Sequence, residues 1–119
     1  MNYFSTRDKS LKFSFKDIFL RGLAPDGGLF LPEKLKIYSS DELNQLMSLS
    51  YIDLATEIIH NFCFEDIDKE KLNNLIRKSY KSFDTREIVN LKRIQTNIKP
   101  IYILELYHGP TLAFKDIAM

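Results

Sequence analysis

The sequence has 119 residues and a mass of 14.0 kDa, which is the size of one ordinary domain. Its hydrophobic fraction of 45%, with nine Phe and six Tyr, suffices for a packed core and excludes a disordered chain. The single cysteine, Cys63, excludes a small secreted scaffold held by internal disulfides. No apolar run approaches the roughly 18 residues of a membrane span, and the polar start has no signal-peptide pattern, so we expect a cytoplasmic protein with no membrane partner.

The net charge of +1 by itself predicts no nucleic-acid partner. Residues 69–99 nevertheless carry nine basic and only three acidic side chains. These lysines and arginines alternate with Leu72, Leu75 and Ile76 at helical spacing, which is typical of a solvated helix face. We therefore favour a helix surface over a nucleic-acid site in this stretch.

The first part of the chain predicts a small helical unit. Apolar residues recur there at helical spacing, and polar residues of the kind that cap helix N-termini precede each stretch. The last of these helices is expected to run to about Phe83, and a turn at residues 24–28 with an extended piece at 29–31 follows the first one. The predicted caps are Ser14, Ser39, Ser50 and Asp68.

The pattern then changes from helical to extended. Residues 88–91 and 101–107 are β-branched and aromatic, which predicts strands. The second run is almost continuously apolar, as expected for a strand buried on both faces of an α/β sheet. Residues 108–111 predict a turn, and Thr111 can cap a helix beginning near Leu112. A buried strand and a barely begun helix do not close an α/β domain, so we expect the sequence to be a fragment.

Common catalytic and binding motifs are absent from the sequence. No nucleophile elbow, glycine-rich phosphate loop or dinucleotide fingerprint occurs. His60 and Cys63 are three residues apart on a predicted helix, but a structural zinc site needs about four ligands, so we predict no metal site. Lys115 follows the second strand at the start of a helix, a position that can make a lysine amine a nucleophile. A surface lysine with its ammonium in water is the alternative interpretation.

Two long segments resemble the threonine synthase family. Residues 105–116, with the sequence Glu-Leu-Tyr-His-Gly-Pro-Thr-Leu-Ala-Phe-Lys-Asp, are similar to the segment that carries the cofactor lysine in that family. Tyr3, the run Ser5–Arg7 and residues 22–32 resemble its N-terminal signature. Asp8 departs from the pattern, because the family usually has glycine there. The two segments occur in the expected order and separation, so the resemblance spans essentially the whole chain.

The resemblance implies an α/β protein that begins with a small, mostly helical N-terminal domain, residues 1–88. Residues 89–119 would then be the first strands of a tryptophan-synthase-like (fold type II) pyridoxal-phosphate domain. Members of the family convert O-phospho-L-homoserine and water to L-threonine and phosphate. By that similarity Lys115 would be the catalytic lysine and would hold pyridoxal 5′-phosphate as a Schiff base. Weaker candidates for contact with the substrate are Thr111, His108 and Arg7.

Members of the family are several times longer than this chain. The phosphate-binding loop and most substrate contacts are therefore expected after residue 119, in the remainder of the same catalytic domain, and the chain alone should be inactive. We expect the full-length form to be a monomer. Two alternatives remain open: a threonine-synthase-like phospho-lyase that acts on another phosphorylated hydroxy-amino acid, and a non-enzymatic helical module whose basic stretch binds an acidic partner.

Overall fold

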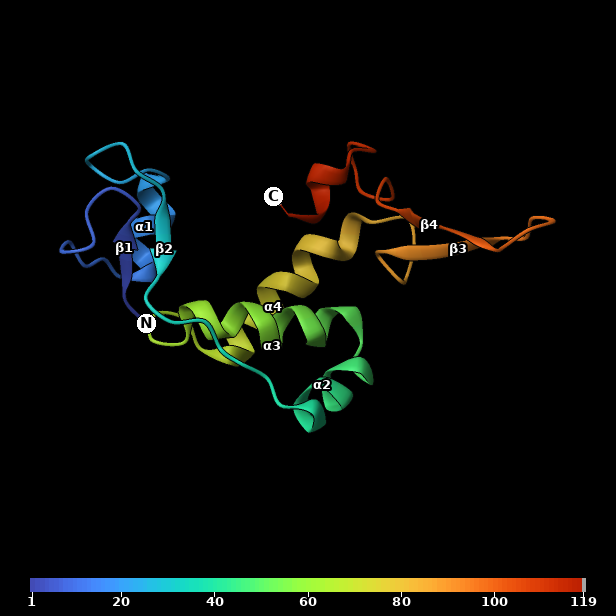
Figure 1. Cartoon of the computed structure of the whole chain (residues 1–119), viewed down its shortest axis with the longest axis horizontal. Helices are drawn as coiled ribbons and strands as arrows, with labels where there is room; N and C mark the ends of the chain where they lie inside the picture. The colour runs from blue at the N-terminus through green and yellow to red at the C-terminus, as the bar shows by residue number, and fades with distance from the viewer. Residues whose placement is uncertain (119) are drawn as a thin grey trace. The chain divides into compact units, whose positions relative to one another are not determined.

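The computed structural model describes residues 1–118 and consists of two compact units (Figure 1). The first unit is Met1–Asn74, and the second begins at Leu75. The helix α4 (Lys69–Ser79) starts in the first unit and ends in the second. The first unit also contains β1 (Tyr3–Ser5), α1 (Phe15–Arg21), β2 (Phe30–Pro32), α2 (Ser40–Met47) and α3 (Tyr51–Cys63). The second contains the 3₁₀ helix η1 (Tyr80–Ser82), β3 (Asn90–Ile94), β4 (Ile101–Glu105) and the 3₁₀ helix η2 (Phe114–Ile117).

All four predicted helix starts are confirmed. Ser14 and Ser39 each accept a hydrogen bond from the backbone N–H three residues later, and the acidic residue there accepts one from the N–H of the cap. Ser50 caps α3 by accepting from the Asp53 N–H, and Asp68 accepts from the N–H groups two and three residues further on. Each cap satisfies backbone donors that have no partner within their own helix, which is why these positions start helices.

The two short strands of the first unit pair antiparallel, with Tyr3 opposite Pro32 and Ser5 opposite Phe30. Tyr3 is buried, and its hydroxyl donates to the backbone carbonyl of Phe62 on α3. Burial raises the pKa of Tyr3 to about 12, so the phenol keeps its proton and remains a donor. Tyr3 thereby connects the strand pair to α3.

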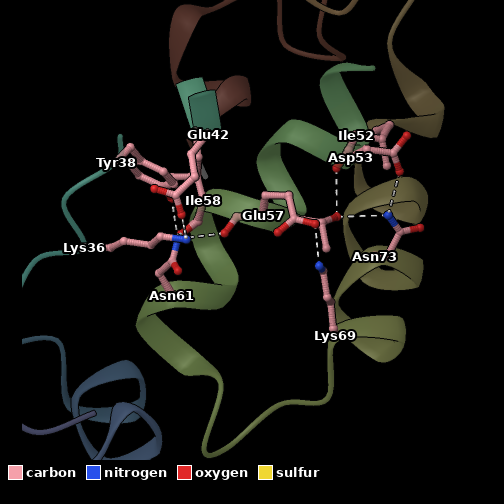
Figure 2. A network of polar contacts seen from close by, with 11 residues as sticks. Lys36, Tyr38, Glu42, Ile52, Asp53, Glu57, Ile58, Asn61, Lys69 and Asn73 are labelled. Atoms are coloured by element: carbon pink, nitrogen blue, oxygen red, sulfur yellow. Dashed lines mark hydrogen bonds and ion pairs between the residues drawn. The ribbon is translucent and has the colours of Figure 1, made fainter. Parts of the chain in front are cut away.

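Polar contacts connect the helices of the first unit (Figure 2). Lys69 on α4 forms an ion pair with Glu57 on α3. One turn further along α4, the Asn73 amide donates to the hydroxyl of the buried Thr56, also on α3, over 3.0 Å. Asn61 of α3 donates to the hydroxyl of Tyr38, which precedes α2. These contacts lie between segments far apart in the sequence and supplement a small apolar core.

The strand pair of the second unit differs from the prediction. The first strand begins at Asn90 instead of residue 88, because Ile88 is buried with a left-handed backbone φ of 63° that no strand accommodates. The β4 strand pairs antiparallel with β3, with Asn90 opposite Glu105 and Ile94 opposite Ile101. Four of its five residues are exposed, so the expected burial on both faces is not observed in residues 1–118. Within the described chain, β3 is the pairing partner of β4. The apolar side chains of β4 are exposed there because no second layer of helices or strands covers them.

The expected helix cap at Thr111 is wrong. Leu112 adopts a left-handed φ of 58°, and the only regular structure that follows among the described residues is the four-residue η2, capped at Ala113 without a side-chain hydrogen bond. The left-handed residue turns the backbone away from the path that an N-cap at Thr111 requires. Throughout residues 1–118, no helix has the length and apolar composition needed to cross a bilayer.

Candidate functional site

The N-terminal signature forms a turn at residues 24–28 that is fixed by one buried hydroxyl, and we call it the signature turn. Ser5 is fully buried, and its hydroxyl lies 2.7 and 2.8 Å from the two carboxylate oxygens of Asp26. The Gly28 N–H donates to the same carboxylate over 2.9 Å. The Gly28 N–H and the Ser5 hydroxyl together hold the pKa of Asp26 below its usual value. The ionised carboxylate is thus part of the fold.

The two glycines of the signature turn have different reasons to be glycine. Gly27 has a φ of 75°, which favours a residue without a side chain. At Gly28 an added Cβ atom would overlap the Ser5 hydroxyl oxygen and lie 3.0 Å from both Asp26 Oδ1 and Thr6 Oγ1. The close approach of two segments therefore dictates Gly28. The resemblance rests on residues that build this turn.

Arg7, expected as a weak candidate for substrate contact, lies at the edge of the signature turn. One guanidinium nitrogen, Nη1, donates to the backbone carbonyl of Asp26 over 2.9 Å, and the Arg7 backbone N–H donates to Ser5 Oγ over 3.1 Å. The residue is exposed, but both contacts hold the N-terminal arm onto the turn. This geometry favours a structural role for Arg7, in which it anchors the N-terminal arm on the signature turn.

A second polar cluster lies at the end of β4, and we call Asp84, Asn90, Glu105 and His108 the His108 cluster. Glu105 is buried with 7% of its surface exposed, and its Oε2 accepts from the Asn90 amide over 3.0 Å. The same oxygen lies 3.0 Å from His108 Nε2, while Asp84 Oδ1 lies 2.9 Å from His108 Nδ1. The Asp84 backbone N–H also donates to the His108 carbonyl over 3.0 Å. His108 is therefore held by both its ring and its backbone.

His108 and Glu105 each shift the pKa of the other in the direction that favours its charged form. The hydrogen bond with Glu105, and then the charge of Asp84, raise the pKa of His108 above its ordinary value. Hydrogen bonds from His108, and then from Tyr107 and Asn90, lower the pKa of Glu105. A protonated imidazole has two N–H donors, and here each ring nitrogen faces one carboxylate. The cluster therefore favours an imidazolium between two carboxylates.

Lys115 lies on η2, and the turn before it is fixed by Asp116. The Thr111 backbone N–H and hydroxyl donate to the two carboxylate oxygens of Asp116 over 2.8 and 2.6 Å. Gly109 permits this approach, because an added Cβ atom there would overlap the Asp116 side chain. Lys115 itself is exposed, and within residues 1–118 its side chain forms no hydrogen bond or ion pair. The structure thus presents a primary amine next to a turn that the Asp116 carboxylate holds in place.

Three of the four expected site residues are neighbours in the sequence and lie in one segment of the second unit. His108, Thr111 and Lys115 lie within eight positions, whereas Arg7 belongs to the first unit. Sequence reasoning missed Asp84, Asn90 and Glu105 as members of a cluster. A usable signal existed only for Glu105, which is the one charged residue in the apolar run 101–107 and, if buried, requires donors.

The ring of His60 and the thiol of Cys63, both on α3, form contacts within the chain. Cys63 is buried, and burial raises the pKa of its thiol, which opposes the thiolate that a metal requires. His60 Nε2 lies 3.2 Å from the Ile67 carbonyl. In the part of the chain that the structure describes, no three His, Cys, Asp or Glu residues are grouped closely enough to hold a metal ion.

Two comparisons with known proteins agree with the resemblance seen in the sequence. A family model described as the threonine synthase N terminus matches residues 2–80. Over its whole length the chain is 38% identical to the threonine synthase of Methylobacillus glycogenes, covering 26% of that protein. The chain belongs to the threonine synthase family. The resemblance inferred from the two segments is confirmed.

Solved threonine synthase structures support the same assignment. The threonine synthase from yeast matches with a TM-score of 0.92 and 38% identity, over 98% of this chain and 24% of that one. A PLP-bound threonine synthase from Brucella melitensis matches with a TM-score of 0.88 and 36% identity, over 99% of this chain and 25% of that one. The chain therefore spans about a quarter of the length of the threonine synthases that it matches.

Proposed function

We propose that this chain is the N-terminal part of a pyridoxal-phosphate-dependent threonine synthase that converts O-phospho-L-homoserine and water to L-threonine and phosphate. One observation carries the proposal: the match to threonine synthases extends along the whole chain, including the segment of Lys115. We propose that the full protein acts in the cytoplasm as a monomer. No feature of the described residues favours the phospho-lyase or the interaction module.

The residues around Lys115 fit a covalently held aldehyde cofactor. The amine is exposed and unpaired within residues 1–118, so it is free to react, and the Asp116 and His108 contacts fix the turn that carries it. Thr111 and His108 have their polar groups bonded to carboxylates of this same chain, so we assign them to the support of the turn. Groups for the cofactor phosphate and ring would come from the remainder of the catalytic domain.

We propose that Lys115 also moves protons. When bound, pyridoxal phosphate supplies an electron sink that stabilises negative charge at the α carbon of an amino-acid substrate. The Lys115 amine would take and return protons at the α and β carbons of the substrate, within hydrogen-bond reach of both. Phosphate would leave from the γ carbon with the bonding electrons, the γ carbon would gain a proton, and water would add at the β carbon. The role of this chain would be to hold one amine at a fixed place.

Reductive trapping with borohydride tests the assignment of Lys115. In the protein that joins this chain to the remainder of its catalytic domain, we expect pyridoxal phosphate to be trapped on Lys115, as read by peptide mass spectrometry. In the 119-residue chain alone we expect weak labelling spread over many lysines, because these residues contain no glycine-rich phosphate cradle. A label on a different lysine of the longer protein would contradict the assignment.

We further propose that residues 1–88 form a helical domain and that residues 89–119 begin the tryptophan-synthase-like (fold type II) catalytic domain. The second compact unit already begins at Leu75. Three observations support a change from helices to strands between residues 80 and 90. The last helical turn before the strands ends at Ser82, β3 begins at Asn90, and the family model ends at residue 80. The capped helices of this part also depend on local contacts, which favour independent folding.

Residues 1–88 expressed alone are expected to give a helical far-ultraviolet circular dichroism spectrum and a cooperative thermal transition. The physical reason is that the buried apolar side chains of the first unit, Tyr3, Ala24, Cys63 and Leu72, all lie within this piece. The 119-residue chain, measured under the same conditions, is the control. A coil spectrum without a transition would show that the boundary is wrong.

A further inference from the structure

We propose that His108 is a positioning residue whose ring, held between the carboxylates of Asp84 and Glu105, sets the course of the backbone that presents Lys115. The inference rests on the proposed function only in taking Lys115 as the reactive amine. It concerns the turn 108–116, in which the His108 contacts come first and the Asp116 contacts follow.

The ring of His108 faces two acceptors, and its protonation state sets how many donors it provides. Both ring nitrogens of His108 lie within 3.0 Å of a carboxylate oxygen, and only 12% of its side chain is exposed. A neutral imidazole has one N–H and can donate to only one of the two carboxylates. A protonated ring donates to both. The geometry at His108 therefore favours the charged form, and loss of its proton would leave one carboxylate without a hydrogen bond from the ring.

The groups around the ring favour the same charged form of His108. Asp84, Glu105 and the ring of Tyr107, whose centroid lies 4.7 Å from that of His108, are the neighbours of the imidazole. The hydrogen bond from the Asn90 amide, and then the charge of Lys92 on β3, favour the ionised form of Glu105. Asp84 is a carboxylate acceptor and the Asn90 amide already donates to Glu105, so neither group can replace the His108 proton.

A series of close contacts connects His108 with the residues next to Lys115. Gly109 follows directly, is buried, and lies so close to Asp116 that a methyl group does not fit between them. Asp116 in turn accepts both hydrogen bonds from Thr111 and is the neighbour of Lys115. A shift of the backbone at His108 is therefore passed through a close contact to the residues around the amine. At the other end of η2 the Tyr80 hydroxyl donates to the Ile117 carbonyl, so the far side of the turn is held independently.

The sign of the pH effect follows from the direction of the pKa shift. The pKa of His108 is raised in the fold, so its contribution to the turn is fully present below the ordinary histidine pKa of about 6.5. That contribution is lost as the pH rises through the raised value. We therefore expect the turn 108–116 to loosen at a pH above the ordinary histidine value, while Asp116, whose pKa is lowered by its hydrogen bonds from Thr111, remains ionised.

Nuclear magnetic resonance of the isotope-labelled 119-residue chain tests the inference without any cofactor. The chain has two histidines, and the ring signals that disappear in His108→Gln belong to His108. We expect its two ring nitrogens to remain protonated above pH 6.5, and the backbone amides of Gly109, Thr111 and Lys115 to shift with the same midpoint. In His108→Gln this inflection should vanish from all three amides. Amides of the signature turn serve as the control and should not follow the midpoint.

Asp84→Asn is the decisive variant, because the Asp84 side chain is 65% exposed and its replacement should leave the fold intact. It should lower the titration midpoint of His108 and carry the amide inflections of residues 109–115 down with it. Glu87→Gln, an exposed acidic residue in the same loop, is the matched control and should leave the midpoint unchanged. The inference is overturned if the amide of Lys115 shows no inflection at the His108 midpoint, or if Asp84→Asn leaves both unchanged. Trapping of the cofactor on another lysine would refute the proposed function and leave these spectra unaffected.

Discussion

Replacing Lys115 by Ala is expected to abolish the release of phosphate from O-phospho-L-homoserine by the protein that contains this chain and the remainder of its catalytic domain. Loss of a lysine that both holds the cofactor and moves protons should lower the rate by a factor of about 10³ or more. The measurement is phosphate release at saturating substrate and cofactor. Since Lys115 is exposed and unpaired within residues 1–118, the variant should keep its stability.

Lys99→Ala is the matched control for this experiment. Lys99 is an exposed lysine in the connection between β3 and β4, so its loss removes the same charge without touching the turn that carries Lys115. We expect its turnover to equal that of the unmodified protein. Full turnover in Lys115→Ala, with an unchanged melting temperature, would show that another residue holds the cofactor.

Replacing Gly28 by Ala is expected to destabilise the first unit by about 2 to 4 kcal/mol. The added methyl group would overlap the hydroxyl oxygen of Ser5, which is fully buried and bonded to Asp26. Gly28 has no left-handed φ, so the effect is one of packing and not of backbone conformation. Urea unfolding followed by circular dichroism gives the change in the free energy of unfolding.

Two variants separate this overlap from other effects at Gly28. Gly22→Ala is the control for conformational strain, because Gly22 has a φ of 73° and no heavy atom within 4 Å of an added Cβ, and it should lower stability by about 1 kcal/mol. In a chain that already has Ser5→Ala, adding Gly28→Ala should cost less than in the unmodified chain, because the overlapping oxygen is gone. Equal costs in both backgrounds would refute the overlap.

Local sequence determined the helices of this protein, because the interactions that start them span only a few residues. Ser14, Ser39 and Ser50 bond to a backbone N–H three positions later, and no distant segment is needed to make that contact. The same locality explains why the turn at residues 24–28 was predicted from its glycines. The family was also evident from two segments of sequence, and it is confirmed by the comparisons.

Tertiary structure decided which polar residues act together. Ser5 meets Asp26 across 21 positions, and Asp84 meets His108 across 24, so no local rule reveals either pair. Thr111 shows the same limit: it has the composition of a helix cap, but the Asp116 carboxylate five positions later takes both of its donors. Glu105 was visible only as one charge in an apolar run, and its role appeared once folding had placed Asn90 and His108 beside it. A hydrogen bond needs its partner within about 3 Å, and for distant residues only the folded chain fixes that separation.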